Sequence, residues 1–318
     1  MSTYALLGAT GATGTSILHH LLQNPPQDLI QLNILVRSKP KLLQTFPTLL
    51  SSRPPPPFKI HIFEGTSTSP HSLTPCLTSA TTILNCVGTN ASNPGTTLHS
   101  TTASAIVSSL TTISLTNKSH YQPPTILQLR TASLNPALSS QVPKLVHSVV
   151  SFCLHNSYSD LEEACNLYIP ASGNGLLNYI LIDPPTLHES PPTGYSLITR
   201  ADEKQDVALS YADLGAAMCE LATTRERLHG KAVGVTARGK VREKWMPLMG
   251  YLIKGAMGRV GERLREGVTF LYGPMAPFFA IVCDSRDDDD DDDDDECFGG
   301  AGSGMLVLEW LAEEWGRV

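Results

Sequence analysis

The feature that most constrains the fold is a run of three glycines near the N-terminus, in the segment LLGATGATG. A short apolar run, residues 4–7, precedes Gly8, and Gly11 and Gly14 follow at intervals of three. An apolar segment with helical spacing then continues to Leu22. A strand, a glycine-rich turn and a helix in this order are typical of a dinucleotide-binding loop at the edge of a parallel α/β sheet.

Each glycine has its own expected role in such a loop. Gly8 permits the tight turn, Gly11 lets the backbone approach a pyrophosphate, and Gly14 lets the helix pack closely on the strand. The helix N-terminus then offers unpaired N–H groups and a positive dipole end to the phosphates. The competing interpretation is a glycine-rich turn without a ligand, and the strand and helix on either side disfavour it.

The spacing Gly-x-x-Gly-x-x-Gly differs from the Gly-x-Gly-x-x-Gly of many dehydrogenases. It resembles the opening of extended and atypical short-chain dehydrogenases/reductases, above all the NAD(P)-binding group with the NmrA-like and HSCARG-like proteins. The resemblance covers residues 3–238. It implies a Rossmann-type doubly wound parallel sheet flanked by helices.

The end of the second expected strand, residues 31–37, indicates which dinucleotide is bound. NAD-preferring folds carry an Asp or Glu there for the ribose hydroxyls, whereas this chain has Arg37 followed by Ser38. Because an arginine can hold a 2′-phosphate bidentately, we expect NADP, with NAD as the alternative. The competing interpretation is an exposed arginine that contacts no ligand.

Alternating and apolar runs predict the other strands. These strands are expected over residues 58–63, 82–88, 123–130, 178–185, 195–199 and 232–237. Helices are expected over residues 41–50, 96–116, 143–168 and 211–223. Strand–helix repeats with short links indicate an α/β fold with a doubly wound parallel sheet.

The remaining chain predicts a helical C-terminal extension. We expect an NAD(P)-binding Rossmann domain with a small substrate-side region over 1–240, a helical extension over 241–283, an acidic disordered linker over 284–304 and a short helix over 305–318. The linker contains nine consecutive aspartates, which repel one another. An apolar stripe within 242–265 is interpreted as core or as a docking face, and peripheral membrane contact is a weaker alternative.

Charge and cysteine usage exclude several classes. The formal net charge is −7, but residues 284–296 alone hold eleven acids and one arginine, so the rest is close to neutral and no nucleic-acid surface is expected. The seven cysteines show no Cys-x-x-Cys spacing, which predicts free thiols and no metal site. Neither a signal peptide nor a run of about 20 apolar residues is present, so we expect a cytoplasmic protein without an integral membrane segment.

The catalytic residues follow only from the resemblance. Short-chain reductases use a tyrosine, a lysine four residues later and a serine after the fifth strand, all near the nicotinamide. Ser133 and, 25 residues further on, Tyr158 match two of these positions. Glu162 stands where the lysine is expected, and a carboxylate there would raise the tyrosine pKa. The classical triad is therefore broken, and the alternative interpretation of Tyr158 is an ordinary half-buried aromatic.

The cofactor-binding residues expected from the loop, the strand ends and the resemblance form one set. They are Gly8, Thr10, Gly11, Ala12, Thr13, Gly14, Arg37, Ser38, Cys86, Val87, Gly88 and Pro184. Two function classes remain open. One is an atypical NADP(H)-dependent oxidoreductase acting on a small organic substrate. The other is a non-catalytic NADP(H)-sensing regulator that binds a protein partner.

Overall fold

The computed structural model describes residues 2–26, 28–50, 58–89, 91–242 and 246–272. An eight-stranded sheet runs through the described part in the order β3-β2-β1-β4-β5-β6-β10-β8, and β7 pairs with β9 in a second, two-stranded sheet. The strands are β1 (Ser2–Leu7), β2 (Ile30–Val36), β3 (Phe58–Glu64), β4 (Thr82–Asn85), β5 (Thr125–Leu129), β6 (Asn178–Asp183), β7 (Thr186–His188), β8 (Tyr195–Ile198), β9 (Ala208–Ser210) and β10 (Lys231–Ala237).

The main sheet is parallel except at one edge, where β8 pairs antiparallel with β10. The chain starts in the middle with β1, which pairs in parallel with both β2 and β4. The strand order therefore reverses between β1 and β4, which creates the crevice where doubly wound folds bind nucleotides. The predicted Rossmann-type architecture is confirmed.

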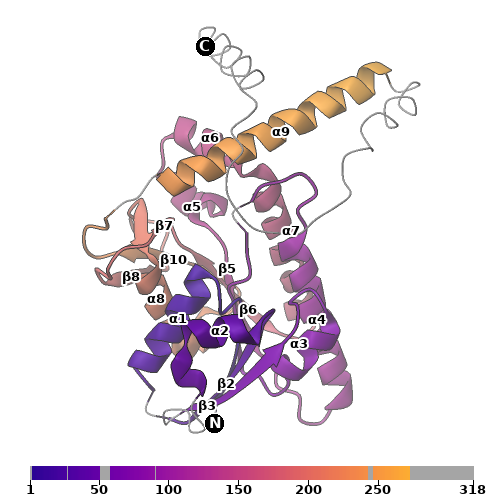
Figure 1. The fold of residues 1–318 in the computed structure, drawn as a ribbon, viewed down its shortest axis with the longest axis vertical. Coiled ribbons are helices and arrows are strands. Elements are labelled where there is room, and N and C mark those ends of the chain that lie inside the picture. The colour runs from indigo at the N-terminus through magenta and orange to yellow at the C-terminus, as the bar shows by residue number, and fades with distance from the viewer. Residues whose placement is uncertain (1, 27, 51–57, 90, 243–245, 273–318) are drawn as a thin grey trace. The chain divides into compact units, whose positions relative to one another are not determined.

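Helices cover both faces of the main sheet (Figure 1). The helices of the described residues are α1 (Ala12–Gln23), α2 (Lys39–Thr45), α3 (Pro70–Leu77), α4 (Leu98–Thr116), α5 (Pro136–Ser139), α6 (Lys144–Cys153), α7 (His155–Gly173), α8 (Tyr211–Thr224) and α9 (Met246–Tyr272). Because both faces are covered, the inner strands β1, β4 and β5 are almost wholly buried, as expected of a parallel sheet.

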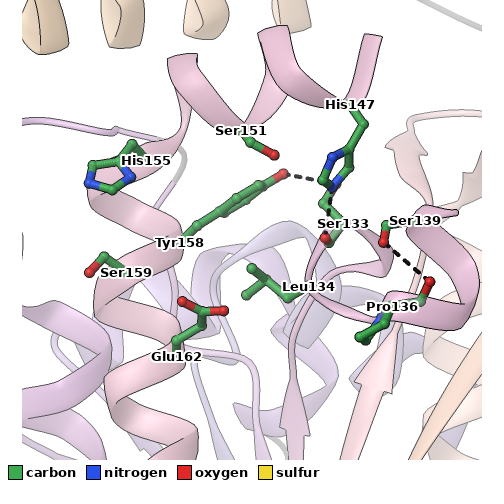
Figure 2. A pocket seen from close by; sticks show the side chains of 10 residues that line it. All are labelled: Ser133, Leu134, Pro136, Ser139, His147, Ser151, His155, Tyr158, Ser159 and Glu162. Carbon is green, nitrogen blue, oxygen red and sulfur yellow. Dashed lines mark hydrogen bonds between the residues drawn. The ribbon is translucent and has the colours of Figure 1, made fainter. Parts of the chain in front are cut away.

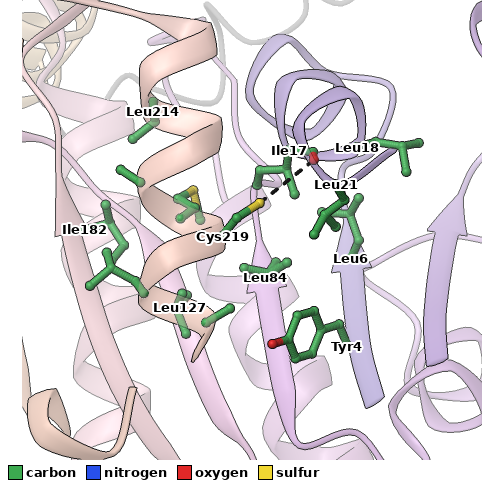
Figure 3. Packing of buried hydrophobic residues seen from close by; sticks show 14 of the residues in the cluster. Tyr4, Leu6, Ile17, Leu18, Leu21, Leu84, Leu127, Ile182, Leu214 and Cys219 are labelled. Carbon is green, nitrogen blue, oxygen red and sulfur yellow. Dashed lines mark hydrogen bonds between the residues drawn. The ribbon is translucent and has the colours of Figure 1, made fainter. Parts of the chain in front are cut away.

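The core is split by the sheet into two clusters. On one face, side chains of α1 and α8 such as Ile17, Leu18 and Leu214 pack against Leu6 and Leu84 of the strands (Figure 3). On the other face, apolar side chains of α3, α4 and α7 pack against the opposite side of β1, β4 and β5. Close packing of this kind fixes the strand ends that carry the candidate site.

Several predicted boundaries differ from the observed ones. The predicted helix 41–50 divides into α2 and a 3-10 turn, Pro47–Leu50, because Pro47 drives the residue before it out of the helical region. The predicted strand 82–88 ends at Asn85. The predicted helical region 143–168 contains two helices, α6 and α7, which are separated at Leu154. The short elements α3, α5, β7 and β9 were not predicted.

The compact unit of the structure comprises Met1–Arg265. The predicted linker over 284–304 and the predicted helix over 305–318 lie outside the described residues, and the domain limits stay predictions. None of the described helices is both long and apolar enough to cross a bilayer. Within the described ranges no cluster of metal-ligating side chains occurs, and the five cysteines found there are free.

Candidate functional site

The glycine loop joins β1 to α1 at the carboxyl edge of the sheet. Gly8 has a φ of +82°, and a Cβ there would lie 2.8 Å from the carbonyl oxygen of Cys86. A side chain at this position would therefore be strained and would also collide with the backbone after β4. This glycine allows the turn to lie against the neighbouring strand end.

The other two glycines differ from each other. A Cβ on Gly14 would lie 2.1 Å from the carbonyl oxygen of Gly8, so the absence of a side chain is what lets α1 approach the turn. A Cβ on Gly11 would meet only that same oxygen, at 3.4 Å, and would otherwise point into open space. Gly11 is also the N-cap of α1, and no side chain caps this helix end.

This arrangement fits a dinucleotide phosphate. Gly11 and Ala12 are exposed, Thr10 is half-buried and Thr13 is buried beneath them. The uncapped N–H groups at the start of α1 can donate to an anion, and the space beside Gly11 is open. A pyrophosphate would fill the cradle that a larger side chain at Gly11 would occupy.

The end of β2 carries the second part of the predicted cofactor site. Arg37 is exposed and forms no salt bridge with another described residue. Ser38 caps α2 by accepting a hydrogen bond from the Lys41 N–H at 3.4 Å. The carboxylate of Glu64 accepts from the Lys39 N–H at 3.0 Å. The guanidinium of Arg37 is therefore available to a ligand.

The chain after β4 lies close to the glycine loop. The Cys86 N–H donates to the Leu7 carbonyl at 3.1 Å, and the Val87 N–H donates to Oδ1 of Asn85 at 3.3 Å. Gly88 is exposed, and a Cβ on it would lie 3.1 Å from Cε1 of His99. Burial raises the pKa of the Cys86 thiol, which keeps it un-ionised.

His99, which follows at the start of α4, was not predicted as part of this site. Its side chain is 8% exposed, and its Nδ1 has no hydrogen-bond partner among the described residues. Burial lowers the pKa of this imidazole, so the neutral form is favoured. The sequence around it is rich in Ser and Thr and gives no motif that marks it.

Pro184, at the end of β6, connects the two halves of the site. Its carbonyl oxygen accepts a hydrogen bond from the Ala132 N–H at 2.9 Å, which ties the end of β6 to the loop after β5. Asp183 beside it is fully buried and bonds Arg130 at the end of β5 through two contacts of 2.7 and 2.6 Å. The loop that carries Ser133 is therefore anchored on both sides.

A pocket of about 370 Å³ opens beside this loop. Figure 2 shows the side chains that line it. They are Ser133, Leu134, Pro136, Ser139, His147, Ser151, His155, Tyr158, Ser159 and Glu162. Four of these residues recur along α7 at intervals of three and four, so they share one face of that helix. The lining is rich in hydroxyl and imidazole groups.

The structure brings the two predicted catalytic residues together. The Tyr158 hydroxyl donates to Oγ of Ser133 at 3.3 Å, although the two residues are 25 positions apart. Burial raises the pKa of Tyr158, whereas its hydrogen bond to Ser133 lowers it by less. Glu162 lines the same pocket one turn further along α7, so a carboxylate stands where the resemblance predicts a lysine.

Asp160, two residues after the tyrosine, does not line the pocket. Its carboxylate accepts hydrogen bonds from the N–H groups of His99 and Ser100 at 2.8 and 2.9 Å, and from the Ser100 hydroxyl at 2.5 Å. These contacts cap the first turn of α4, where the helix leaves N–H groups unpaired. Asp160 therefore holds α7 against α4 and is not a candidate proton carrier.

The chain is similar to several fungal proteins. It is 51% identical over 280 residues to averufin oxidase A of Aspergillus flavus. The aligned region covers 86% of this chain and 97% of that protein. It is 52% identical over 265 residues to averufin oxidase A of Dothistroma septosporum, which covers 81% of this chain and 92% of the relative. The chain belongs to the averufin oxidase A family. No protein-family model matches the sequence.

Solved structures show the same fold outside the averufin oxidase A family. A short-chain dehydrogenase/reductase from Veillonella parvula in complex with NADP superimposes with a TM-score of 0.53 at 18% identity, covering 76% of this chain and 98% of that one. The anaerobilin reductase ChuY of Escherichia coli O157:H7 gives the same TM-score at 12% identity, covering 76% and 100%. This averufin oxidase A relative therefore shares the Rossmann fold of these structures, as its glycine loop predicts.

Proposed function

We propose that this protein is an NADP(H)-dependent oxidoreductase acting on a small organic molecule, with averufin as the first substrate to test. The observation that carries the proposal is the contact of 3.3 Å between Tyr158 and Ser133 in a pocket at the edge of the sheet that holds the glycine loop. Its relatives are named for the oxidation of averufin. A pocket of about 370 Å³ is in the range of small-molecule sites.

We propose the following contacts between the described residues and the cofactor. The uncapped start of α1 and the open side of Gly11 would hold the pyrophosphate, and Gly88 would lie against the ribose next to the nicotinamide. The guanidinium of Arg37 would hold the 2′-phosphate, which favours NADP over NAD. The bound nicotinamide supplies the chemistry of hydride transfer, which no side chain of this chain can perform.

Two side chains of the pocket would bind the reacting oxygen of the substrate and exchange a proton with it. The reacting oxygen of the substrate would lie within hydrogen-bond distance of both Ser133 and Tyr158. Ser133 orients that oxygen through its hydroxyl, and Tyr158 exchanges a proton with it. Because burial raises the pKa of Tyr158, this tyrosine works from its neutral form and not as a standing phenolate.

The test combines binding and turnover. NADPH and NADH affinities are measured by fluorescence titration, and averufin is incubated with NADP⁺ while reduced cofactor is followed by absorbance and the product by mass spectrometry. Tyr158→Phe is expected to lower turnover at least about 100-fold. Tyr121→Phe is the matched control, because its hydroxyl bonds the Leu176 carbonyl at 2.6 Å, away from the pocket. Equal activity of the two variants would contradict the assigned role.

A second candidate function rests on Glu162. A carboxylate cannot take the part of the helper lysine, so a non-catalytic NADP(H)-sensing regulator that binds a protein partner is the alternative. It is distinguished by the same experiment. Tight NADPH binding without turnover of averufin or of a panel of alcohols and ketones would favour the regulator over the enzyme.

A further inference from the structure

The ring of His147 is held by a backbone carbonyl at the pocket wall. Its Nε2 lies 3.1 Å from the carbonyl oxygen of Ser133. A carbonyl oxygen only accepts hydrogen bonds, so Nε2 must carry the proton in this contact. In the neutral ring the other nitrogen, Nδ1, is then unprotonated, and the same hydrogen bond fixes the orientation of the imidazole.

His147 and Tyr158 meet at the same residue. The imidazole bonds the carbonyl oxygen of Ser133, and the phenol bonds its hydroxyl. Figure 2 shows the Tyr158 hydroxyl, from α7, and the His147 ring, from α6, both directed toward Ser133. His147 and Tyr158 are therefore linked through Ser133, one to its backbone and the other to its side chain, at the wall of the pocket.

Tyr158 lacks the lysine that would lower its pKa, so it needs another proton acceptor. Burial raises the pKa of Tyr158, and Glu162 replaces the lysine that would lower it. An un-ionised tyrosine can accept a proton from an alcohol only if its own proton leaves at the same time. The imidazole of His147, which is oriented by its bond to the Ser133 carbonyl, offers its second nitrogen as an acceptor for that proton.

We propose that His147 is the proton relay of this site, in place of the missing lysine. This inference rests on the proposed function. When an alcohol is oxidised, its O–H proton passes to the Tyr158 oxygen, and the Tyr158 proton passes to Nδ1 of His147, directly or through one water. The C–H electron pair leaves as hydride to NADP⁺, and a carbonyl forms. The imidazolium then releases its proton to solvent, so one proton and one NADPH appear per turnover.

Few ionisable groups line the pocket together with the imidazole of His147. The ionisable groups that line the pocket with it are His155, Tyr158 and Glu162, all from α7. Lys144 lies one turn earlier on α6. The segment from the end of β5 through α5 contributes Ser133, Leu134, Pro136 and Ser139 to the lining, and none of them is charged. Arg130 is held by Asp183 at the base of this loop and does not line the pocket.

The decisive variant is His147→Gln. A glutamine amide can donate to the Ser133 carbonyl as the imidazole does, but it cannot accept and release a proton. We expect it to lower kcat about 100-fold for the alcohol of the test panel that the wild type oxidises fastest, to leave KM and NADPH affinity within about threefold, and to remove one ionisation from the kcat–pH profile. His155→Gln, on the same pocket, is the matched control and should keep that ionisation.

A purely positioning role predicts a different result. If His147 only holds the Ser133 loop, His147→Gln keeps kcat within about threefold, whereas His147→Phe loses activity with the hydrogen bond. That pattern would overturn the relay and leave the proposed function standing. A wild-type protein without turnover would overturn both.

A spectroscopic measurement tests the relay without turnover. In a long-range ¹H–¹⁵N spectrum of the full chain, the His147 ring signals are identified by their loss in His147→Gln. The neutral ring should show the pattern of the Nε2–H tautomer and should gain a proton on Nδ1 as the pH falls. An Nδ1–H tautomer, or a ring that takes up no proton down to the pH at which the protein unfolds, would overturn the relay alone.

Discussion

The guanidinium of Arg130 and the carboxylate of Asp183 join the ends of two neighbouring strands. Nε lies 2.7 Å from Oδ1 and Nη2 lies 2.6 Å from Oδ2, which makes the pair bidentate. Asn135 adds a third hydrogen bond to Oδ2, at 2.7 Å. Burial raises the pKa of Asp183, whereas the bonds from Arg130 and Asn135 oppose that shift. The pair fixes the loop that carries Ser133.

Breaking this pair should destabilise the protein strongly. Asp183→Asn removes the negative charge but keeps the shape, so Arg130 is left with an uncompensated charge in a site where its side chain is only 13% exposed. We expect a loss of about 3–5 kcal/mol in the free energy of unfolding, measured by urea denaturation. Asp202→Asn is the matched control, because the Arg200–Asp202 pair is about 70% exposed and should contribute less than about 1 kcal/mol. Similar losses in both variants would contradict the anchoring role.

Substitutions of Gly11 and Gly14 should have different effects. The change at Gly14 should mainly lower stability, and the change at Gly11 should mainly weaken cofactor binding. Gly14→Ala places a Cβ 2.1 Å from a backbone oxygen, so α1 must move away and we expect a loss of about 1–3 kcal/mol or more in the free energy of unfolding. Gly11→Ala meets nothing closer than 3.4 Å and should cost about 1 kcal/mol or less. NADPH affinity should nevertheless fall in Gly11→Ala, because the new methyl group enters the phosphate cradle.

Thermal unfolding and NADPH titration of both variants check this pair of expectations. An unchanged NADPH affinity in Gly11→Ala, and also in the larger Gly11→Val, would mean that the pyrophosphate does not lie over this glycine. A stable Gly14→Ala protein would mean that α1 tolerates displacement from the turn.

The glycine loop and the positions of the main strands along the chain could be predicted because their signals are local. Turn, strand and helix follow one another within 22 residues, and apolar runs mark the buried strands. The Arg130–Asp183 pair could not be predicted in this way. No sequence pattern links Asp183 to Arg130, and only the pairing of β5 with β6 shows that the two residues stand opposite each other.

The geometry of α6 and α7 explains why Asp160 does not line the pocket and why the role of His147 could not be predicted. Asp160 follows Tyr158 by two residues, so it points about 200° away around α7 and meets α4 instead. That outcome could have been deduced from the spacing. His147 lies on a separate helix, and its contact with the Ser133 carbonyl depends on the break at Leu154, which no sequence pattern marked.

Tyr158 should remain un-ionised at physiological pH. Desolvation disfavours the phenolate and raises the pKa of this residue above the ordinary value of about 10. The ultraviolet difference spectrum between wild type and Tyr158→Phe should therefore contain no phenolate absorbance up to pH 9. A phenolate signal near pH 7–8 that disappears in the variant would show that another group lowers the tyrosine pKa, and would remove the need for a relay.

Arg37 should decide between the two dinucleotides. It is exposed at the end of β2 and forms no salt bridge with a described residue, so its removal should not unfold the protein. Arg37→Ala is expected to weaken NADPH by about 1.5–3 kcal/mol and to leave NADH nearly unchanged, because only NADPH carries the 2′-phosphate. Arg200→Ala, which removes another exposed cation, should change neither affinity. Equal losses for both cofactors in Arg37→Ala would show that this arginine does not contact the 2′-phosphate, and the preference for NADP would then need another source.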